Sequence, residues 1–251
     1  MKGRLILLEI KKVEGIIATE RPYGETSKIL DILTKDMGVI SVISKGAKRL
    51  KSNLRSVSEL FTYASFEISY KKDKLSTLIS ADIIDPLNNI KKDIEKISYL
   101  NFILELAKQV MKQSLNKNIY EILISSITKI NEGYDALVIT NILELKYLDF
   151  LGVSPYFDGC AICDSKDVIT LSSSRGGFVC TKHKDNEYIV SSKTIKIIRL
   201  LRFVDISKIS KLDLSDEVKN EINNFIDDYY DRYTGLYLKS KSFLKNIAQI
   251  K

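Results

Sequence analysis

All the cysteines and the only histidine of this chain fall within one short segment. They form two hooks, Cys160-x2-Cys163 and Cys180-x2-His183, with sixteen residues between them. This spacing is typical of a closed tetrahedral zinc site, because each hook can hold one edge of the ion while the intervening chain folds back as a hairpin. Two unrelated cysteine pairs are the alternative.

The two hooks predict a structural metal site. A catalytic zinc keeps one coordination position open for water or substrate, whereas four protein ligands fill every position. A nucleobase deaminase needs a histidine before its cysteines, and here the single histidine follows them. Redox use of Cys160 and Cys163 alone stays open, although no thioredoxin-like pattern surrounds them. We therefore expect Zn²⁺ as a structural cofactor.

Composition favours a cytosolic protein that can bury substantial cores. Of the 251 residues, 45% are hydrophobic and 28% are charged. No apolar run approaches the roughly 20 residues of a membrane span, and the apolar residues 5–10 are too short for a signal peptide. Three cysteines cannot all pair as disulfides, and reduced thiols suit the cytoplasm.

The net charge of +7 is concentrated in the first third of the chain. Residues 1–80 contain fifteen Lys and Arg against nine Asp and Glu, whereas the remaining 171 residues contain 24 against 23. One acid-free run, residues 37–58, carries five cations: Lys45, Lys48, Arg49, Lys51 and Arg55. The run could be a solvated basic loop. We favour a phosphate-contacting strip, since cations that neutralise phosphates release counterions and give affinity without sequence preference.

The same third predicts five short strands bounded by turn-forming residues, at 13–18, 28–34, 39–44, 60–70 and 75–81. Five strands in about 80 residues is typical of an OB-fold barrel, which binds single strands with a positive groove and stacking aromatic rings. Alternation along the 60–70 strand places Phe61 and Tyr63 on one face and Phe66 and Tyr70 on the other. One of these two faces must belong to the barrel core. The candidate rings are Tyr23, Phe61, Tyr63, Phe66 and Tyr70.

Helical periodicity replaces strand periodicity at Asp85-Pro86, where we expect a cap and a first helical residue. A strongly apolar helix is predicted at 136–150 with Asp135 as its cap, and later helices are predicted to start at Ser192 and Ser215. The predicted fold class is α+β and multidomain, with an inserted Cys3His zinc finger. The expected domains are an OB-fold barrel at 1–82, a helical bundle in two parts at 83–155 and 191–251, and the zinc insert at 156–190.

Five short segments are weak singly but specific in combination. They are EGII at 14–17, RPYGETSK at 21–28, MGVI at 37–40, SKGAKR at 44–49 and LKSKSFL at 238–244. Together with the order of the domains, they resemble the RecO family of bacterial recombination mediators. The resemblance extends from about residue 13 to residue 244 and leaves the first ten residues without a counterpart. Family members often carry four cysteines at the metal, whereas the last ligand here is His183.

The resemblance implies a non-enzymatic mediator that acts in the cytoplasm, at the nucleoid. RecO proteins bind single- and double-stranded DNA, anneal complementary strands and, with RecR, help RecA replace the single-strand-binding protein SSB. An acidic and apolar SSB tail would suit a groove near Lys108, Lys112 or Arg199. The DNA-binding residues that the resemblance implies are Arg21, Lys45, Lys48, Arg49, Lys51 and Arg55.

Two other classes of protein stay open. A zinc nuclease or deaminase needs open coordination or a carboxylate cluster, and the densest acidic group, Asp227, Asp228 and Asp231, suggests a helix surface. An RNA-binding OB protein with a zinc ribbon has the same composition as a DNA-binding one. Complementary strands coated with SSB distinguish the three, because a mediator anneals them without ATP, an enzyme changes the covalent substrate, and an RNA-binding protein prefers RNA.

Overall fold

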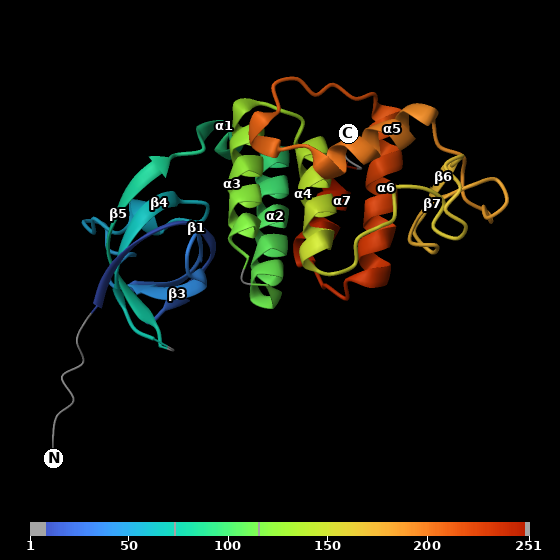
Figure 1. Ribbon diagram of the computed structural model, residues 1–251. Coiled ribbons are helices and arrows are strands. Elements are labelled where there is room, and N and C mark those ends of the chain that lie inside the picture. Colours follow the sequence, from blue (N-terminus) through green and yellow to red (C-terminus); the bar gives the residue numbers. More distant parts are fainter. Residues whose placement is uncertain (1–8, 73, 115, 249–251) are drawn as a thin grey trace, which may run out of the picture. The chain divides into compact units, whose positions relative to one another are not determined.

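The computed structural model describes residues 9–72, 74–114 and 116–248, and the chain divides into two compact units between Asn88 and Asn89 (Figure 1). The first unit is a β-barrel, and the second is a set of helices with a two-stranded sheet. The predicted α+β class is confirmed. In the described part of the chain, no helix is long and apolar enough to cross a membrane.

Five strands close the barrel in the order β1-β2-β3-β5-β4. All neighbouring strands are antiparallel except β3 and β5, which pair in parallel. A five-stranded barrel of this connectivity is an OB fold. The strands are β1 (Glu9–Tyr23), β2 (Ser27–Thr34), β3 (Gly38–Ser44), β4 (Tyr63–Tyr70) and β5 (Ser76–Asp85), with a 3₁₀ turn, η1 (Ser56–Ser58), before β4.

The first strand is longer than predicted because it closes the barrel, pairing with both β2 and β4. The two pairings overlap at Gly15 and Ile16, and Gly15 lies opposite Thr34 on one side and Ala64 on the other. A Cβ atom on Gly15 would lie 2.6 Å from the Ile32 side chain, so only glycine fits. Of the ten residues outside the family resemblance, the last two pair with β4, and residues 1–8 lie outside the described residues.

The barrel core decides which face of β4 is buried. Phe66 and Ile68 belong to the buried cluster, whereas Tyr63 on the other face is half-buried. The strand starts at Tyr63 and not at residue 60, because Phe61 has a left-handed φ of 66° that strand residues do not adopt. The core consists of Val13, Ile17, Leu30, Ile32, Val42, Ala64, Phe66, Ile68 and Leu78.

The second unit contains the helices and the small sheet. Within it, α2, α3 and α4 lie side by side, with α6 and α7 beside them (Figure 1). The elements are α1 (Asn88–Lys91), α2 (Ile94–Gln113), α3 (Lys117–Glu132), α4 (Ala136–Phe150), β6 (Thr170–Ser172), β7 (Gly177–Val179), α5 (Ser192–Phe203), η2 (Ile206–Lys208), α6 (Asp216–Tyr233) and α7 (Lys239–Ala248).

The predicted helix start at Asp85-Pro86 is wrong. Asp85 is the last residue of β5, and its carboxylate accepts a hydrogen bond from the backbone N–H of Leu87, 2.7 Å away. The long helix α2 is capped by Asp93, which accepts from the N–H groups of its first turn. In an Asx turn, as in a helix cap, the Asp carboxylate accepts a hydrogen bond from a backbone N–H two or three residues later. The sequence therefore does not distinguish the turn at Asp85 from a helix start.

The other predicted caps fall on or next to the observed ones. Asp135 accepts from the N–H of Val138 at 3.1 Å, as expected at the start of α4. Ser191, one residue before the predicted Ser192, caps α5 through the N–H of Thr194 at 3.1 Å. Adjacent serines carry the same side chain, so only the local backbone decides which one caps.

Candidate nucleic-acid interface and metal group

The basic loop, residues 45–58 between β3 and β4, is a chain of four consecutive turns. In each turn the backbone N–H of the fourth residue donates to the carbonyl of the first, at 3.0–3.4 Å. The turn-bounding residues are Gly46, Arg49, Ser52, Arg55 and Ser58. Two bonds tie the start of the loop to the β1–β2 turn, from Lys48 N to Thr26 O at 2.8 Å and from Gly46 N to Ser27 Oγ at 3.2 Å. The backbone of the loop is therefore held in place on the barrel.

The five cations predicted on this loop all point into solvent. In the part of the chain that the structure describes, none of the five forms an ion pair with a carboxylate. Five unneutralised positive charges on a fixed backbone attract a polyanion, and each can hold one phosphate. The loop residues concerned are Lys45, Lys48, Arg49, Lys51 and Arg55.

The sixth candidate cation, Arg21, has a different environment. Its guanidinium lies 3.5 Å from the carboxylate of Asp31, whose side chain is almost completely buried. That carboxylate also accepts hydrogen bonds from Thr19 at 2.8 Å and Ser41 at 2.6 Å, across three strands. Asp31, a charged residue that the sequence reasoning missed, partly neutralises Arg21. A DNA phosphate would have to compete with the Asp31 carboxylate for the Arg21 guanidinium. We therefore expect Arg21 to contribute least to DNA binding among the six candidates.

Of the five candidate rings, Tyr23 is the one left open to solvent, with half of its surface exposed. Phe61 and Phe66 are buried in the barrel. The Tyr63 hydroxyl donates to the Glu14 carboxylate at 2.8 Å, and the Tyr70 ring lies under the Lys11 ammonium at 4.2 Å. Tyr23 ends β1 just before the turn to which the basic loop is tied, so it is available as a stacking platform beside that loop.

The four predicted metal ligands converge in space. The ligand atoms of Cys160, Cys163, Cys180 and His183 all lie within 4.8 Å of one another, and the group could hold a metal ion. The Cys163 and Cys180 sulfurs are 3.8 Å apart, and the His183 Nδ1 atom is 3.6 Å and 3.4 Å from the sulfurs of Cys160 and Cys180. The prediction that these residues form one group, and not two separate pairs, is confirmed.

These distances fit a tetrahedral zinc. Bonds of about 2.3 Å to sulfur and about 2.0 Å to nitrogen separate two sulfur ligands by roughly 3.8 Å and a sulfur from a nitrogen by roughly 3.6 Å. The three thiolate-forming residues and one imidazole are also the soft ligand set that zinc prefers.

The two cysteines of the first hook differ in their electrostatics. Burial opposes ionisation of the Cys160 thiol, but the N–H groups of Ile162, Cys180 and Cys163 point at its sulfur and lower its pKa to about 6. The N–H of Ser165 acts in the same direction on the exposed Cys163, but partial loss of hydration and the neighbouring sulfurs of Cys160 and Cys180 raise the Cys163 pKa. A cation that neutralises the clustered sulfurs removes this repulsion.

Tight backbone contacts shape the first hook. A Cβ atom on Gly159 would lie 2.8 Å from the Asp164 carbonyl oxygen, and Asp164 itself has a left-handed φ of 59°. The Asp164 carboxylate is held by the Tyr156 hydroxyl and by Lys166. Further along, a Cβ atom on Gly177 would lie 2.1 Å from the Tyr156 carbonyl oxygen, where the two residues form a bridge. Two glycines thus allow the chain to fold closely around the ligands.

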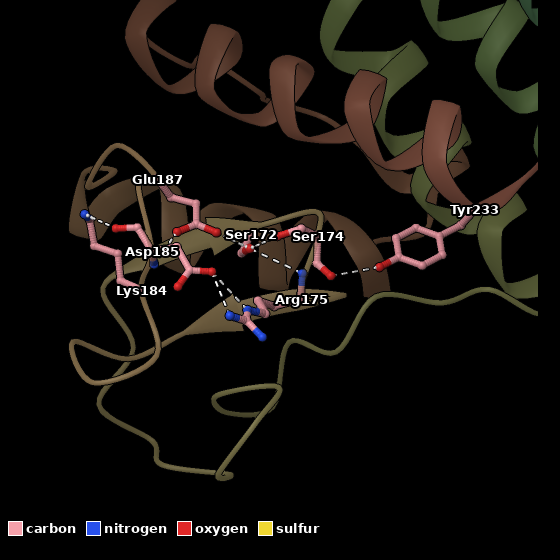
Figure 2. A network of polar contacts seen from close by, with 7 residues as sticks. All are labelled: Ser172, Ser174, Arg175, Lys184, Asp185, Glu187 and Tyr233. Atoms are coloured by element: carbon pink, nitrogen blue, oxygen red, sulfur yellow. Dashed lines mark hydrogen bonds and ion pairs between the residues drawn. The ribbon is translucent and has the colours of Figure 1, made fainter.

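A network of polar contacts joins the β6–β7 hairpin to the segment after the second hook and to α6 (Figure 2). Arg175, in the β6–β7 turn, pairs with the Asp185 carboxylate at 2.7 Å, and Ser172 bonds to Glu187. From the helix side, the Tyr233 hydroxyl donates to the carbonyls of Ser173 and Ser174 in the turn, and Figure 2 shows the contact with Ser174. The metal group is therefore linked through its hairpin to the bundle.

Aromatic rings continue this link inside the unit. The Phe157 and Phe178 rings are 4.9 Å apart, and Phe157 packs in turn on Phe225 of α6 at 5.8 Å. Arg199, one of three cations considered for an SSB groove, lies over the Phe178 ring and donates to the Phe157 carbonyl at 2.9 Å. Arg199 thus supports this packing, while the SSB contact stays a prediction.

The acidic group that a nuclease would need is tied up in ion pairs. Asp227 and Asp231 pair with Lys241 at 3.3 and 3.2 Å, and Asp228 pairs with Arg232 at 3.0 Å. Among the described residues, the Cys3His group is the one cluster of three or more His, Cys, Asp and Glu side chains close enough to share an ion.

Comparison with known proteins covers both units. The family model described as "Recombination protein O N terminal" matches residues 8–87, and the one described as "Recombination protein O C terminal" matches residues 91–242. The DNA repair protein RecO of Bacillus cytotoxicus is 36% identical over 242 residues, which cover 94% of this chain and 97% of that protein. The proteins of the same name from Bacillus cereus and Bacillus anthracis match to the same extent.

Proposed function

This chain belongs to the RecO family, and on that premise we propose that it is a DNA repair and recombination mediator that holds DNA on the basic loop of its barrel. The observation that carries the proposal is the set of five exposed cations on a loop whose backbone is held by turns. The DNA-binding residues are Lys45, Lys48, Arg49, Lys51 and Arg55, with a smaller share from Arg21.

Strand annealing follows from the same surface. Two complementary strands repel each other through their phosphates, and a protein that neutralises several phosphates on each lowers the barrier to their encounter. The contacts go to the backbone, so the bases stay available for pairing and any sequence is accepted. Double-stranded DNA presents the same phosphates and is bound by the same loop.

The family supplies the partners of this proposal. The protein acts with RecR to help RecA replace SSB on single-stranded DNA, in the cytoplasm at the nucleoid. It performs no covalent chemistry, in agreement with four ligands that leave no open coordination position and with acidic side chains that pair with cations.

Zn²⁺ is the metal we propose for the Cys3His group, with a structural role. Cys160, Cys163, Cys180 and His183 would hold it and so fix the hairpin that packs on α6. The four-part division into a barrel at 1–82, helices at 83–155 and 191–251 and a zinc insert at 156–190 is part of the same proposal.

The deciding experiment is annealing of complementary oligonucleotides coated with SSB. We expect annealing without ATP or free divalent metal, at a rate that falls steeply as salt rises, with every strand keeping its starting length. Cleavage or ATP hydrolysis that a point substitution in this chain removes would favour the enzyme, and a strong preference for RNA strands would favour the RNA-binding alternative.

A further inference from the structure

Leu50 is the most exposed large apolar side chain among the described residues, with 84% of its surface open to solvent. It lies on the basic loop, between the exposed cations Arg49 and Lys51. Exposing an isolated leucine is ordinary, but exposing one at the centre of a cationic strip places apolar surface where a polyanion would bind.

The turns of the loop make this exposure specific. Each of the four turns has one apolar residue at a central position. Ala47 and Val57 are buried, and Leu54 packs against the barrel core. Only Leu50 faces outward, at the turn closed by the bond from Ser52 N to Arg49 O at 3.1 Å. The other three anchor the loop, and Leu50 contributes nothing to that anchoring.

We infer that Leu50 is a base-contacting residue, which packs against or wedges between the bases of a DNA strand while the neighbouring cations hold its phosphates. Leucine is among the side chains that proteins insert between base steps, because its apolar surface replaces the face of a neighbouring base. The inference rests on the proposed function, since it requires a strand on the basic loop.

The chemistry beside Leu50 favours a nucleic acid over a protein partner. Lys48, Arg49 and Lys51 are within two residues of it and have no carboxylate partner in the described chain, so every charged residue within two positions of Leu50 is a cation without an acidic partner. An apolar contact inside such a cluster fits a ligand that is anionic along its backbone and apolar on its flat faces. A strand with unpaired bases has both properties.

Leu50 therefore makes the affinity for DNA depend on whether the bases of the strand are accessible, and not on its phosphates alone. The cations respond to charge alone, and their contribution is the same for any phosphate backbone. A contact to bases adds affinity only where bases are unstacked. This addition would favour single-stranded regions over duplex DNA.

The test compares two single strands of equal length and charge, one of normal thymidines and one in which abasic sites replace the bases. We expect Leu50→Ser to reduce the affinity ratio between the two strands by about three- to tenfold, and Leu50→Phe to raise it, because an aromatic ring stacks better on a base. The slope of affinity against salt should stay that of the wild type in both variants. Leu200→Ser is the matched control, since Leu200 is an exposed leucine of α5.

The results separate this inference from the proposed function. If Leu50→Ser and Leu50→Phe leave the ratio at the wild-type value while the salt slope is normal, the base contact is refuted and Leu50 is free to contact a protein. If charge reversal of the basic loop leaves the salt slope unchanged, the proposed DNA surface itself fails. Should Leu50→Ser not fold, Leu50→Phe decides alone, and an unchanged or lower ratio overturns the inference.

Discussion

Tyr233, near the end of α6, donates its hydroxyl hydrogen bond to the carbonyl oxygen of Ser173, 2.9 Å away at the tip of the β6–β7 hairpin. The two residues are sixty positions apart in the sequence. The same hydroxyl also approaches the Ser174 carbonyl at 3.3 Å, and the Tyr229 and Tyr233 rings pack at 4.5 Å. Through Tyr233, the segment that carries the metal ligands is attached to the helices.

The first prediction concerns this attachment. Tyr233→Phe keeps the ring packing but removes the hydroxyl, and should lower the free energy of unfolding by about 0.5–1.5 kcal/mol, the usual contribution of one hydrogen bond. Urea denaturation measures the change. Tyr237→Phe is the control, because Tyr237 is strongly exposed. Equal effects of the two substitutions would argue against a docking role for Tyr233.

The second prediction concerns the metal. Protein purified without chelator should contain about one zinc per chain, and Cys160→Ser or Cys180→Ser should lose it. Because the ligands fix the hairpin, hydrogen exchange should rise in residues 156–190 and stay unchanged in the barrel. Elemental analysis and exchange mass spectrometry provide the two readouts. Metal-free protein with a normally protected hairpin would contradict the assignment.

The third prediction concerns the basic loop. Reversing the charges of Lys48, Arg49 and Lys51 together should weaken single-strand binding for every sequence and lower the salt slope by about one unit per lost phosphate contact. Titrations at several salt concentrations measure both. The control reverses three exposed lysines of the helical unit, Lys193, Lys196 and Lys211. A triple variant with wild-type affinity and slope would move the DNA surface away from the barrel.

The fourth prediction concerns barrel closure. Gly15→Ala places a methyl group 2.6 Å from both the Ile32 side chain and the Leu33 carbonyl oxygen, so one strand pair must separate. Overpacking of this kind typically costs about 1–3 kcal/mol. Thermal unfolding should show the loss, and DNA affinity should fall with the fraction of folded barrel. A variant as stable as the wild type would mean that β1 tolerates displacement at its crossing point.

The fifth prediction concerns pH. The hydrogen bond from Ser173, together with Arg232, lowers the pKa of Asp228 below its ordinary value. A carboxylate whose pKa is lower in the folded state stabilises the protein above the unfolded-state pKa, and that stabilisation disappears as the pH falls through the folded-state pKa. The stability difference between wild type and Asp228→Asn should therefore stay constant near neutral pH and shrink only as the pH falls below about 5 and on through the lowered folded-state pKa. A constant difference would show that Asp228 acts through shape alone.

Features encoded by nearby residues could be predicted from the sequence. The hooks at Cys160 and Cys180 specify their own metal geometry, because each pair of ligands is three residues apart. Strand alternation and turn residues likewise predicted a five-stranded barrel, and an acid-free run located the five loop cations. Segments 14–17 and 44–49, with the other short motifs, were sufficient to indicate the family that the comparisons then established.

Features that depend on partners distant in the chain were decided by the tertiary structure. Arg21 and Asp31 become partners because β1 and β2 pair, so the charge available to DNA at Arg21 depends on a strand register. Which ring is left for stacking was also undetermined, since alternation separates two faces but burial selects one of them. Leu50 and Leu54 are the same residue type on the same loop, yet one lies in solvent and the other packs on the barrel. The sequence pattern does not distinguish the two leucines. Only the path of the backbone over the barrel core decides which of them is buried.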